Sequence, residues 1–147
     1  MNSQMMKKVL VVHGPNLNLL GERDPAFYGN VTFAKLNEMI LDRADALGIQ
    51  CEIFQSNHEG AIIDRLQAAR NTFDGVILNA GAYTHYSYTI RDAIADMQLP
   101  CVEVHISNVQ ARDDFRAKSV IAPVCIGTIA GFGINSYFLA LQALAML

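Results

Sequence analysis

The sequence predicts an α/β fold, with five parallel strands between two layers of helices. Short apolar runs alternate five times with segments of helical periodicity, no break in composition divides the 147 residues, and the first apolar run, Val9–Val12, is typical of a strand buried on both faces. A five-stranded sheet of this size most often has the flavodoxin-like order 2-1-3-4-5. We therefore expect one domain over residues 1–147, a three-layer sandwich with its crevice beyond the carboxyl ends of strands 1 and 3.

An unusually long connection follows the first strand. Gly14 and Pro15 end the strand abruptly, and the next helical pattern begins only near residue 33, whereas most strand-to-helix connections take about two to six residues. Long loops in compact domains are usually functional or disordered. We interpret this one as an active-site loop whose distal part moves on glycine hinges; its notable residues are Asn16, Gly21, Arg23, Tyr28 and Gly29.

The first half of the chain continues with a helix, a strand and a second helix. Thr32 is a candidate N-cap and Gly48 a candidate end for a helix whose apolar residues recur at helical spacing. Residues 49–55 are expected to form the second strand. Ser56–Asn57 are expected to cap the next helix, whose inward face comprises Ile62, Ile63, Leu66, Ala69 and Phe73.

The second half repeats the alternation. A third strand, Val76–Leu78, runs into a polar, aromatic turn, and Ser87 is expected to cap the short helix that follows. A fourth strand over Cys101–Ile106 leads into a charged segment, and Val124–Ile126 is a weak fifth strand. The closing helix starts at Ile134 and has the apolar stripe Tyr137, Phe138, Leu141, Leu144 and Ala145.

Composition limits the partners of the chain. A hydrophobic fraction of 52% and a mean hydropathy of +0.21 are high for a free monomer, so we expect other subunits to cover part of the apolar surface. The net charge is -3 and no basic run is longer than Lys7-Lys8, which argues against nucleic-acid binding.

The cysteines and the hydropathy pattern indicate a compartment. Cys51, Cys101 and Cys125 are far apart and odd in number, as expected of reduced core thiols in a cytoplasmic protein. The sequence has no signal-peptide core and no run of about 20 apolar residues, so we expect a soluble protein that does not bind membranes.

The fourth strand carries a candidate general acid. Because side chains alternate along a strand, Glu103, His105 and Ser107 lie on one face. A histidine beside a carboxylate has a fixed tautomer and a greater tendency to hold a proton, which suits a general acid. The alternative is a buried histidine that makes only a structural hydrogen bond.

Arginines accompany a tyrosine in the sequence. Arg112 and Arg116 are one helical turn apart and project together if their segment is helical, and Arg23 comes from the long loop. A tyrosine of ordinary pKa, about 10, is about 0.1% ionised at neutral pH, and bringing that pKa near 7 requires about 4 kcal/mol. Two guanidinium groups in a closed site could supply this, so Tyr28 is a candidate base. A solvated basic face is the alternative for any one arginine.

Other polar residues are ambiguous when taken singly. Asn16 and Asn79 follow strand ends, where an amide can hold a water or a substrate oxygen, or form an Asx-turn. His85 lies just before the helix that Ser87 caps and is available to a ligand or to that cap. Asp92 is on the same helix, and taken by itself it would be interpreted as an ordinary surface residue.

Several chemistries lack their sequence signatures. No G-x-G-x-x-G follows the first strand and no G-x-x-x-x-G-K-[ST] or G-x-S-x-G occurs, so dinucleotides, P-loop nucleotides and a hydrolase serine lose their main support. None of the four lysines lies at the carboxyl end of a predicted strand, so we expect no imine. The histidines lack metal-ligand spacing, and we predict neither a metal nor a cofactor.

The candidate residues belong to a series of longer motifs. These are His13-Gly14-Pro15-Asn16-Leu17-Asn18-Leu19-Leu20-Gly21, Arg23, Tyr28-Gly29, Gln55-Ser56-Asn57-His58-Glu59-Gly60, Asn79, Gly81-Ala82, Thr84-His85, Glu103-Val104-His105-Ile106-Ser107-Asn108, Arg112 and Phe115-Arg116. In order and spacing they resemble the type II 3-dehydroquinate dehydratases from about Lys7 to the last helix. The chain departs from that pattern at Ala80, where the family usually has proline, at Gln110, where histidine is common, and at Asp113-Asp114, where Glu-rich pairs are usual.

The resemblance implies a hydro-lyase of the shikimate pathway. Such an enzyme converts 3-dehydroquinate to 3-dehydroshikimate and water by anti elimination through an enolate, without a cofactor. Tyr28 would be the base, held as tyrosinate by Arg23 and Arg112. His105, oriented by Glu103, would protonate the departing hydroxyl.

The resemblance also assigns binding roles and an assembly. Asn16 would hold a water against the enolate oxygen, an interaction made where charge develops. The substrate carboxylate would rest on residues 106–107 and Asn79, and the ring hydroxyls would meet His85 and Arg116. The family forms a dodecamer built from trimers, in which Asp92 would reach the site of a neighbouring subunit. The implied substrate-binding residues are Asn79, His85, Asp92, Ile106, Ser107 and Arg116.

Other functions of the same fold fit the residues less well. A receiver domain needs acidic residues at the end of strand 1 and a lysine at the end of strand 5, where this chain has His13 and Ile126-Gly127. A flavodoxin needs a Ser/Thr-rich phosphate loop in place of Gly14-Pro15-Asn16. Two alternatives stay open: an enzyme that acts on another cyclic hydroxy acid, and a role in quinate breakdown instead of aromatic biosynthesis.

Overall fold

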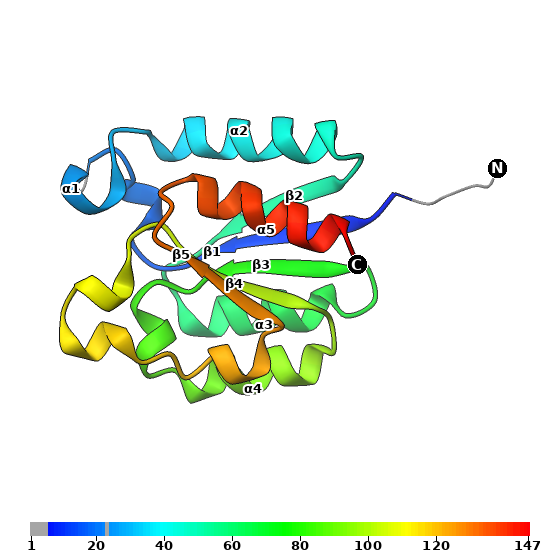
Figure 1. Ribbon diagram of the computed structural model, residues 1–147. Helices are drawn as coiled ribbons and strands as arrows, with labels where there is room; N and C mark the ends of the chain where they lie inside the picture. Colours follow the sequence, from blue (N-terminus) through cyan, green and yellow to red (C-terminus); the bar gives the residue numbers. More distant parts are fainter. Residues whose placement is uncertain (1–5, 23) are drawn as a thin grey trace.

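The computed structural model describes residues 6–22 and 24–147, without the side chain of Phe27. They contain one parallel sheet of five strands in the predicted order β2-β1-β3-β4-β5 (Figure 1). The strands are β1 (Lys8–His13), β2 (Gln50–Gln55), β3 (Gly75–Asn79), β4 (Cys101–His105) and β5 (Gly127–Ala130). The α/β fold predicted from the alternating pattern is confirmed.

Two long helices cover each face of the sheet (Figure 1). They are α2 (Phe33–Ala46) and α5 (Asn135–Ala145) on one face, and α3 (Glu59–Ala69) and α4 (Tyr88–Met97) on the other. Because successive strand residues point to opposite faces, Val9 and Val11 pack in the core beneath α2 and α5, and Leu10 and Val12 in the core beneath α3 and α4. The first strand is therefore buried on both faces, as predicted.

The helix boundary signals at three positions are confirmed. The Thr32 hydroxyl accepts a hydrogen bond from the Lys35 N–H (3.1 Å), and the Ser87 hydroxyl accepts one from the Ile90 N–H (3.1 Å). Gly48 follows α2 with a φ of 72°, a conformation that ends a helix at little cost for glycine.

The prediction that Ser56–Asn57 cap α3 is wrong. The N-cap is His58, and the Ser56 hydroxyl accepts a hydrogen bond from the His58 N–H (2.9 Å) in a turn before the helix. The Asn57 side chain instead accepts a hydrogen bond from the Asn16 N–H (3.0 Å). These polar side chains therefore shape the connections, and α3 starts later than their cap propensity suggested.

The fifth strand is Gly127–Ala130, so its predicted position at residues 124–126 is wrong. A short 3-10 helix, η5 (Ala122–Val124), comes first. Pro123 favours this turn because its fixed φ suits a helix and its missing N–H cannot join a strand ladder. β5 is short and incompletely buried, which leaves little periodicity to detect.

Short helices fill the loops at the carboxyl edge of the sheet, on the left in Figure 1. They are η1 (Leu17–Leu19) and α1 (Pro25–Tyr28) after β1, η2 (Gly81–His85) after β3, and η3 (Val109–Ala111) and η4 (Asp114–Ala117) after β4. The loops after β1 and β3 touch: a Cβ on Gly14 would lie 2.6 Å from the Ala80 carbonyl carbon, so this close approach requires glycine. The loops that follow strands 1 and 3, where the crevice was predicted, therefore lie against each other.

The long loop after β1 is more regular than expected. Asp24 caps α1 by accepting a hydrogen bond from the Ala26 N–H (3.0 Å), and Pro25 occupies the first helical position. Gly21 and Gly29 have φ values of 95° and 75°; motion of the loop about them stays a prediction. In the described part of the chain, no helix combines the length and apolar character needed to cross a membrane.

Candidate active site

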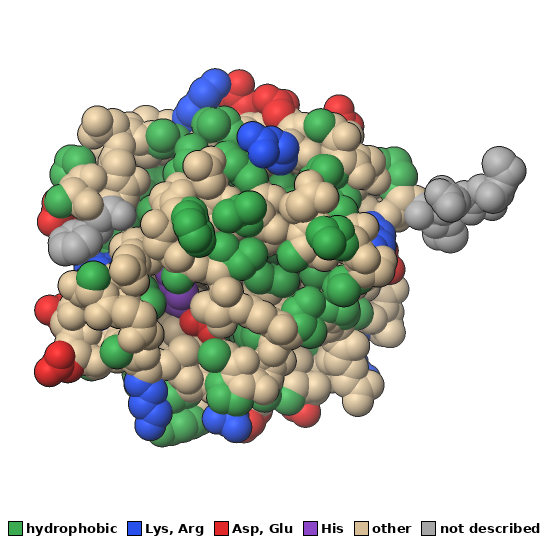
Figure 2. Space-filling model, viewed as in Figure 1, with side chains coloured by type: hydrophobic (Ala, Val, Ile, Leu, Met, Phe, Trp, Pro, Cys, Tyr) green, Lys and Arg blue, Asp and Glu red, His purple; other side chains and the backbone are tan. Residues whose placement is uncertain are grey.

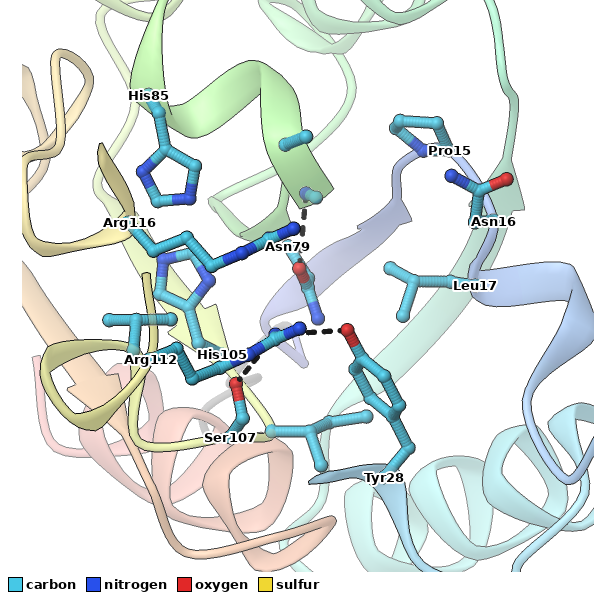
Figure 3. A pocket seen from close by; sticks show the side chains of 14 residues that line it. Pro15, Asn16, Leu17, Tyr28, Asn79, His85, His105, Ser107, Arg112 and Arg116 are labelled. Atoms are coloured by element: carbon cyan, nitrogen blue, oxygen red, sulfur yellow. Dashed lines mark hydrogen bonds between the residues drawn. The ribbon is translucent and has the colours of Figure 1, made fainter. Parts of the chain in front are cut away.

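A cavity lies where the loops after β1, β3 and β4 meet (Figure 3). Most of the sequence-predicted site residues line it: Asn16, Tyr28, Asn79, His85, His105, Ile106, Ser107, Arg112 and Arg116. Pro15, Leu17, Gly81, Ala82 and Val109 complete the lining. The cavity lies at the carboxyl edge, close to β1 and β3, as the doubly wound fold predicts.

Tyr28 and Arg112 meet across this cavity. Tyr28 ends α1 and is half-buried, and the Arg112 guanidinium donates a hydrogen bond to its hydroxyl (3.0 Å). Arg112 also donates to the Ser107 hydroxyl (3.3 Å), so Figure 3 shows the guanidinium between the two oxygens. The arrangement places a positive charge beside the phenol oxygen.

Arg112 and Arg116 both line the cavity, but not because a helix carries them. Arg112 lies between η3 and η4 with extended backbone angles (φ -104°, ψ -154°), so no single helical turn joins it to Arg116. Arg116 belongs to η4, where Asp113 pairs with its Nε (3.3 Å). The irregular backbone therefore aims two guanidinium groups into one cavity.

Glu103 and His105 lie on the same face of β4, as predicted. The His105 Nε2 and the Glu103 Oε2 are 2.5 Å apart, and both side chains are buried. The other carboxylate oxygen, Oε1, accepts hydrogen bonds from the hydroxyls of Ser119 (2.9 Å) and Thr128 (3.4 Å). Both carboxylate oxygens of Glu103 are therefore hydrogen-bonded. Because Glu103 bonds Nε2 of His105, Nδ1 is the ring nitrogen that a ligand in the cavity could contact.

His85 stacks over His105 at the other side of the cavity. The ring centroids are 6.4 Å apart and the planes differ by 17°. Burial lowers the pKa of His85 and the charges of His105 and Arg116 act in the same direction, whereas the hydrogen bond to the Lys118 carbonyl (2.8 Å) raises it. The lowered pKa favours the neutral imidazole, in which Nδ1 donates to the Lys118 carbonyl and Nε2 is an acceptor.

Asn79 is held at the end of β3. Its side-chain oxygen accepts a hydrogen bond from the Gly81 N–H (3.2 Å), the Asx-turn that the sequence left as an alternative to a binding role. Gly81 has a φ of +60°, and a Cβ there would lie 3.1 Å from the Pro15 carbonyl oxygen. Asn79 makes the turn and also lines the cavity, and its binding role stays a prediction.

Asn16 takes a left-handed conformation (φ 71°) just past β1. The Asn16 N–H donates a hydrogen bond to the Asn57 side-chain oxygen (3.0 Å). The same oxygen also accepts a hydrogen bond from Gln55 Nε2 (3.1 Å). Gln55 reaches the Gly14 carbonyl as well (3.2 Å). Gln55 and Asn57 are therefore supports for Asn16 that residue-by-residue reasoning missed, and their only sequence signal was their place in a family motif.

Of the predicted site residues that the structure describes, Glu103 and Asp92 do not line the cavity. Arg23 lies outside the described residues. Asp92 is exposed on α4 and does not line the cavity. Among the described residues, no group of three or more His, Cys, Asp or Glu side chains is placed to hold a metal ion.

Comparison with known proteins identifies relatives over almost the whole chain. The family model "Dehydroquinase class II" matches residues 7–145. A protein from Caldicellulosiruptor saccharolyticus named 3-dehydroquinate dehydratase is 56% identical over 140 residues, which is 95% of this chain and 97% of the relative. One of the same name from Bacillus cereus is 57% identical over 139 residues, 95% of each chain.

Solved structures agree with the sequence relatives. The type II dehydroquinase from Butyrivibrio crossotus has a TM-score of 0.93 at 49% identity and covers 95% of this chain and 97% of its own. The type II dehydroquinase from Propionibacterium acnes has a TM-score of 0.94 at 39% identity, covering 99% and 100%. The similarity in fold therefore extends over the full sheet, its helices and the loops that line the cavity.

Proposed function

Because the chain belongs to the class II dehydroquinase family, we propose that it eliminates water from 3-dehydroquinate through an enolate, with Tyr28 as the base and His105 as the acid. As a member of this family, the chain is a hydro-lyase, a type II 3-dehydroquinate dehydratase, and we place its reaction in the shikimate pathway. The observation that carries the mechanism is the hydrogen bond from Arg112 to Tyr28.

The first step needs a base strong enough to deprotonate carbon. Tyr28 as phenolate takes the proton from the carbon next to the ketone, and the C–H electrons form the enolate. The Arg112 guanidinium, 3.0 Å from the phenol oxygen, supports the anionic form of the base through a charge-assisted hydrogen bond. Arg23, which the family resemblance pairs with Arg112, would add a second positive charge.

The second step needs an acid for the departing hydroxyl. The enolate electrons form the new C=C bond as the C–O bond breaks, and His105 gives its proton to the leaving oxygen, which departs as water. The Glu103 carboxylate on Nε2 stabilises the imidazolium form and fixes the ring, so that Nδ1 faces the occupant of the cavity. The step involves no net oxidation or reduction.

The remaining residues bind the substrate and its enolate. Asn16 would hold a water against the enolate oxygen, where negative charge appears. The substrate carboxylate would rest on the backbone of Ile106 and Ser107, the Ser107 hydroxyl and Asn79. His85, through its Nε2 acceptor, and Arg116 would meet the ring hydroxyls.

We further propose that the working enzyme is a cytoplasmic homododecamer built from trimers. Hydrophobic side chains gather over α5 in Figure 2. Leu139 on α5 is 45% exposed, and Phe132, shortly before α5 in the chain, is 62% exposed. Asp92, exposed on α4, would complete the cavity of a neighbouring copy. Co-expressed Asp92→Ala and Tyr28→Phe chains should then regain activity in mixed oligomers, whereas no recovery would place Asp92 outside the site.

An ultraviolet assay tests the reaction directly. The purified protein should convert 3-dehydroquinate to a product with the absorbance of a conjugated enone, and borohydride added with the substrate should not inactivate it, because no imine forms. Absence of enone formation would reject the substrate. Inactivation with a covalent mass increase would reject the enolate route in favour of an imine.

A further inference from the structure

Beneath the cavity, a buried chain of hydrogen bonds joins four elements of the fold. It runs from Asn79 at the end of β3 to Tyr137 on α5, then to His13 at the end of β1 and to Asn37 on α2. The distances are 3.0 Å from Asn79 Nδ2 to the Tyr137 hydroxyl, 3.0 Å from that hydroxyl to His13 Nδ1, and 2.9 Å from His13 Nε2 to Asn37 Oδ1. His13 and Tyr137 are fully buried, and Asn79 is 4% exposed.

The direction of each hydrogen bond in this chain is determined. The Gly81 N–H can only donate, so the Asn79 atom that it contacts must be the amide oxygen. The atom of Asn79 that faces Tyr137 is then the amide nitrogen, which donates to the Tyr137 hydroxyl. At the other end of the chain, the Asn37 oxygen can only accept, so His13 carries its proton on Nε2 and donates it there. The unprotonated Nδ1 of the neutral ring then accepts the hydrogen of the Tyr137 hydroxyl, which itself accepts from Asn79.

The electrostatics of His13 agree with this assignment. Burial lowers the pKa of His13 to about 4, against a smaller rise from the hydrogen bond with Asn37, so the ring is neutral at physiological pH. A neutral ring has one donor and one acceptor nitrogen, which is what Asn37 and Tyr137 require. A protonated His13 would present a donor to Tyr137 and leave the hydroxyl hydrogen without this acceptor.

We infer that His13 and Tyr137 are positioning residues that hold the Asn79 amide in its binding orientation. The Asn79 nitrogen has two hydrogens, and Tyr137 accepts one of them. Because Asn79 lines the cavity, the second hydrogen is the one available to an anionic or carbonyl oxygen there. The inference rests on the proposed binding role of Asn79, and it extends that role to residues that do not line the cavity.

Tyr137→Phe tests the inference, since it removes one oxygen and keeps the ring. Loss of one neutral hydrogen bond that orients a binding group should raise KM for 3-dehydroquinate about three- to tenfold, with kcat changed less than about twofold. A variant that only weakened the fold would not separate KM from kcat in this way. Ile62→Val is the control for lost stability, because it shortens a core side chain of α3 on the opposite face of the sheet. It should leave KM and kcat unchanged.

The double variant with Asn79→Ala decides whether Tyr137 acts through Asn79. In that background, Tyr137→Phe should change kcat/KM by less than about twofold, because the group that it positions is gone. An effect as large as in the wild type would contradict the inference, and so would an unchanged KM in the single variant.

Asn37→Ala removes the last partner in the same series of hydrogen bonds. Asn37 lies on α2 and is only half-buried, so this variant should fold even if Tyr137→Phe does not. Without the Asn37 oxygen, nothing fixes the His13 proton on Nε2, and we expect a smaller rise in KM that also disappears in the Asn79→Ala background. Glu38→Ala, one residue further on the exposed side of α2, is the matched control and should change neither constant.

Calorimetric binding of quinate, the alcohol analogue of the substrate, separates this inference from the proposed reaction. Suppose that the wild type formed no enone, but that Tyr137→Phe weakened quinate binding in the wild-type background and not in the Asn79→Ala background. The proposed mechanism would then fail, while the positioning role of Tyr137 would hold. If enone formed normally and neither KM nor quinate affinity responded to Tyr137→Phe, the positioning role would fail and the mechanism would hold.

Discussion

The guanidinium of Arg112 lies 3.0 Å from the hydroxyl of Tyr28, although 84 positions separate the two residues in the sequence. One comes from the short helix after β1 and the other from the irregular segment after β4. The fold thus places a permanent cation against a phenol inside a cavity.

Arg112→Lys should impair the enzyme although it keeps the charge. Both hydrogen bonds, to the Tyr28 and Ser107 oxygens, come from one nitrogen, Nη1, of the rigid planar guanidinium. The flexible lysine side chain does not hold its ammonium in that place, so we expect kcat/KM to fall by about tenfold or more. Steady-state kinetics measures the loss, and Arg91→Lys, whose guanidinium binds the Val120 carbonyl (3.4 Å), is the control. A normal kcat/KM for Arg112→Lys would remove Arg112 from this role.

Glu103→Gln should weaken the acid step and leave substrate binding largely intact. The amide keeps the shape of the carboxylate but not the charge that stabilises imidazolium on His105. We expect kcat to fall by at least about tenfold, part of the about 10²–10⁴ that general acid catalysis contributes. Glu52→Gln, at an exposed position of β2, should behave as the wild type. An unchanged kcat for Glu103→Gln in steady-state kinetics would reject the role.

The stability of the fold should decrease on acidification because of His13. Its pKa is lowered from 6.5 to about 4 in the fold, so between these values the unfolded chain binds a proton that the native protein does not. Stability therefore falls as the pH drops through this window, by up to about 3 kcal/mol. Urea unfolding at pH 7, 6 and 5 and constant protein concentration measures it. His13→Gln should flatten the dependence and His58→Gln should not; an unchanged slope in His13→Gln would contradict the assignment.

Ala80→Pro should stabilise the protein. Ala80 has a φ of -79°, close to the value that proline imposes, and Asn79 before it is in a strand, the conformation that a residue preceding proline prefers. We expect a gain of about 0.4–1 kcal/mol in unfolding free energy, from the lower entropy of the unfolded chain. Ala93→Pro, inside α4, is a buried alanine at which the same change should destabilise. A loss at position 80 would show that the ring collides with its buried neighbours.

The elements with strong periodicity could be predicted from the sequence. β1 is a continuous apolar run and α2 has a capping threonine and a terminal glycine, so both were found within one or two residues. β5 was missed because it is short and half exposed, and the proline turn before it looked like a strand in an apolar run. Hydrophobic periodicity identifies a helix or strand reliably only when the whole length of one of its faces is buried.

The site was predictable for a different reason. The pairing of Glu103 with His105 follows from alternation along one strand, whereas the pairing of Tyr28 with Arg112 depends on two loops whose meeting no local pattern reveals. The family resemblance supplied that second pairing. The chain of hydrogen bonds through His13 and Tyr137 was not foreseen, since Tyr137 appeared in the sequence as one apolar position in the stripe of the last helix.

The central claim is that the Tyr28 oxygen removes the proton from carbon, and Tyr28→Phe tests it most directly. The variant should lose about 10²–10⁴ in the rate of enone formation from 3-dehydroquinate, bind quinate with nearly the affinity of the wild type, and be matched by a fully active Tyr88→Phe control at an exposed tyrosine. Enone formation at a near-normal rate by Tyr28→Phe would contradict the account, whatever the other residues do.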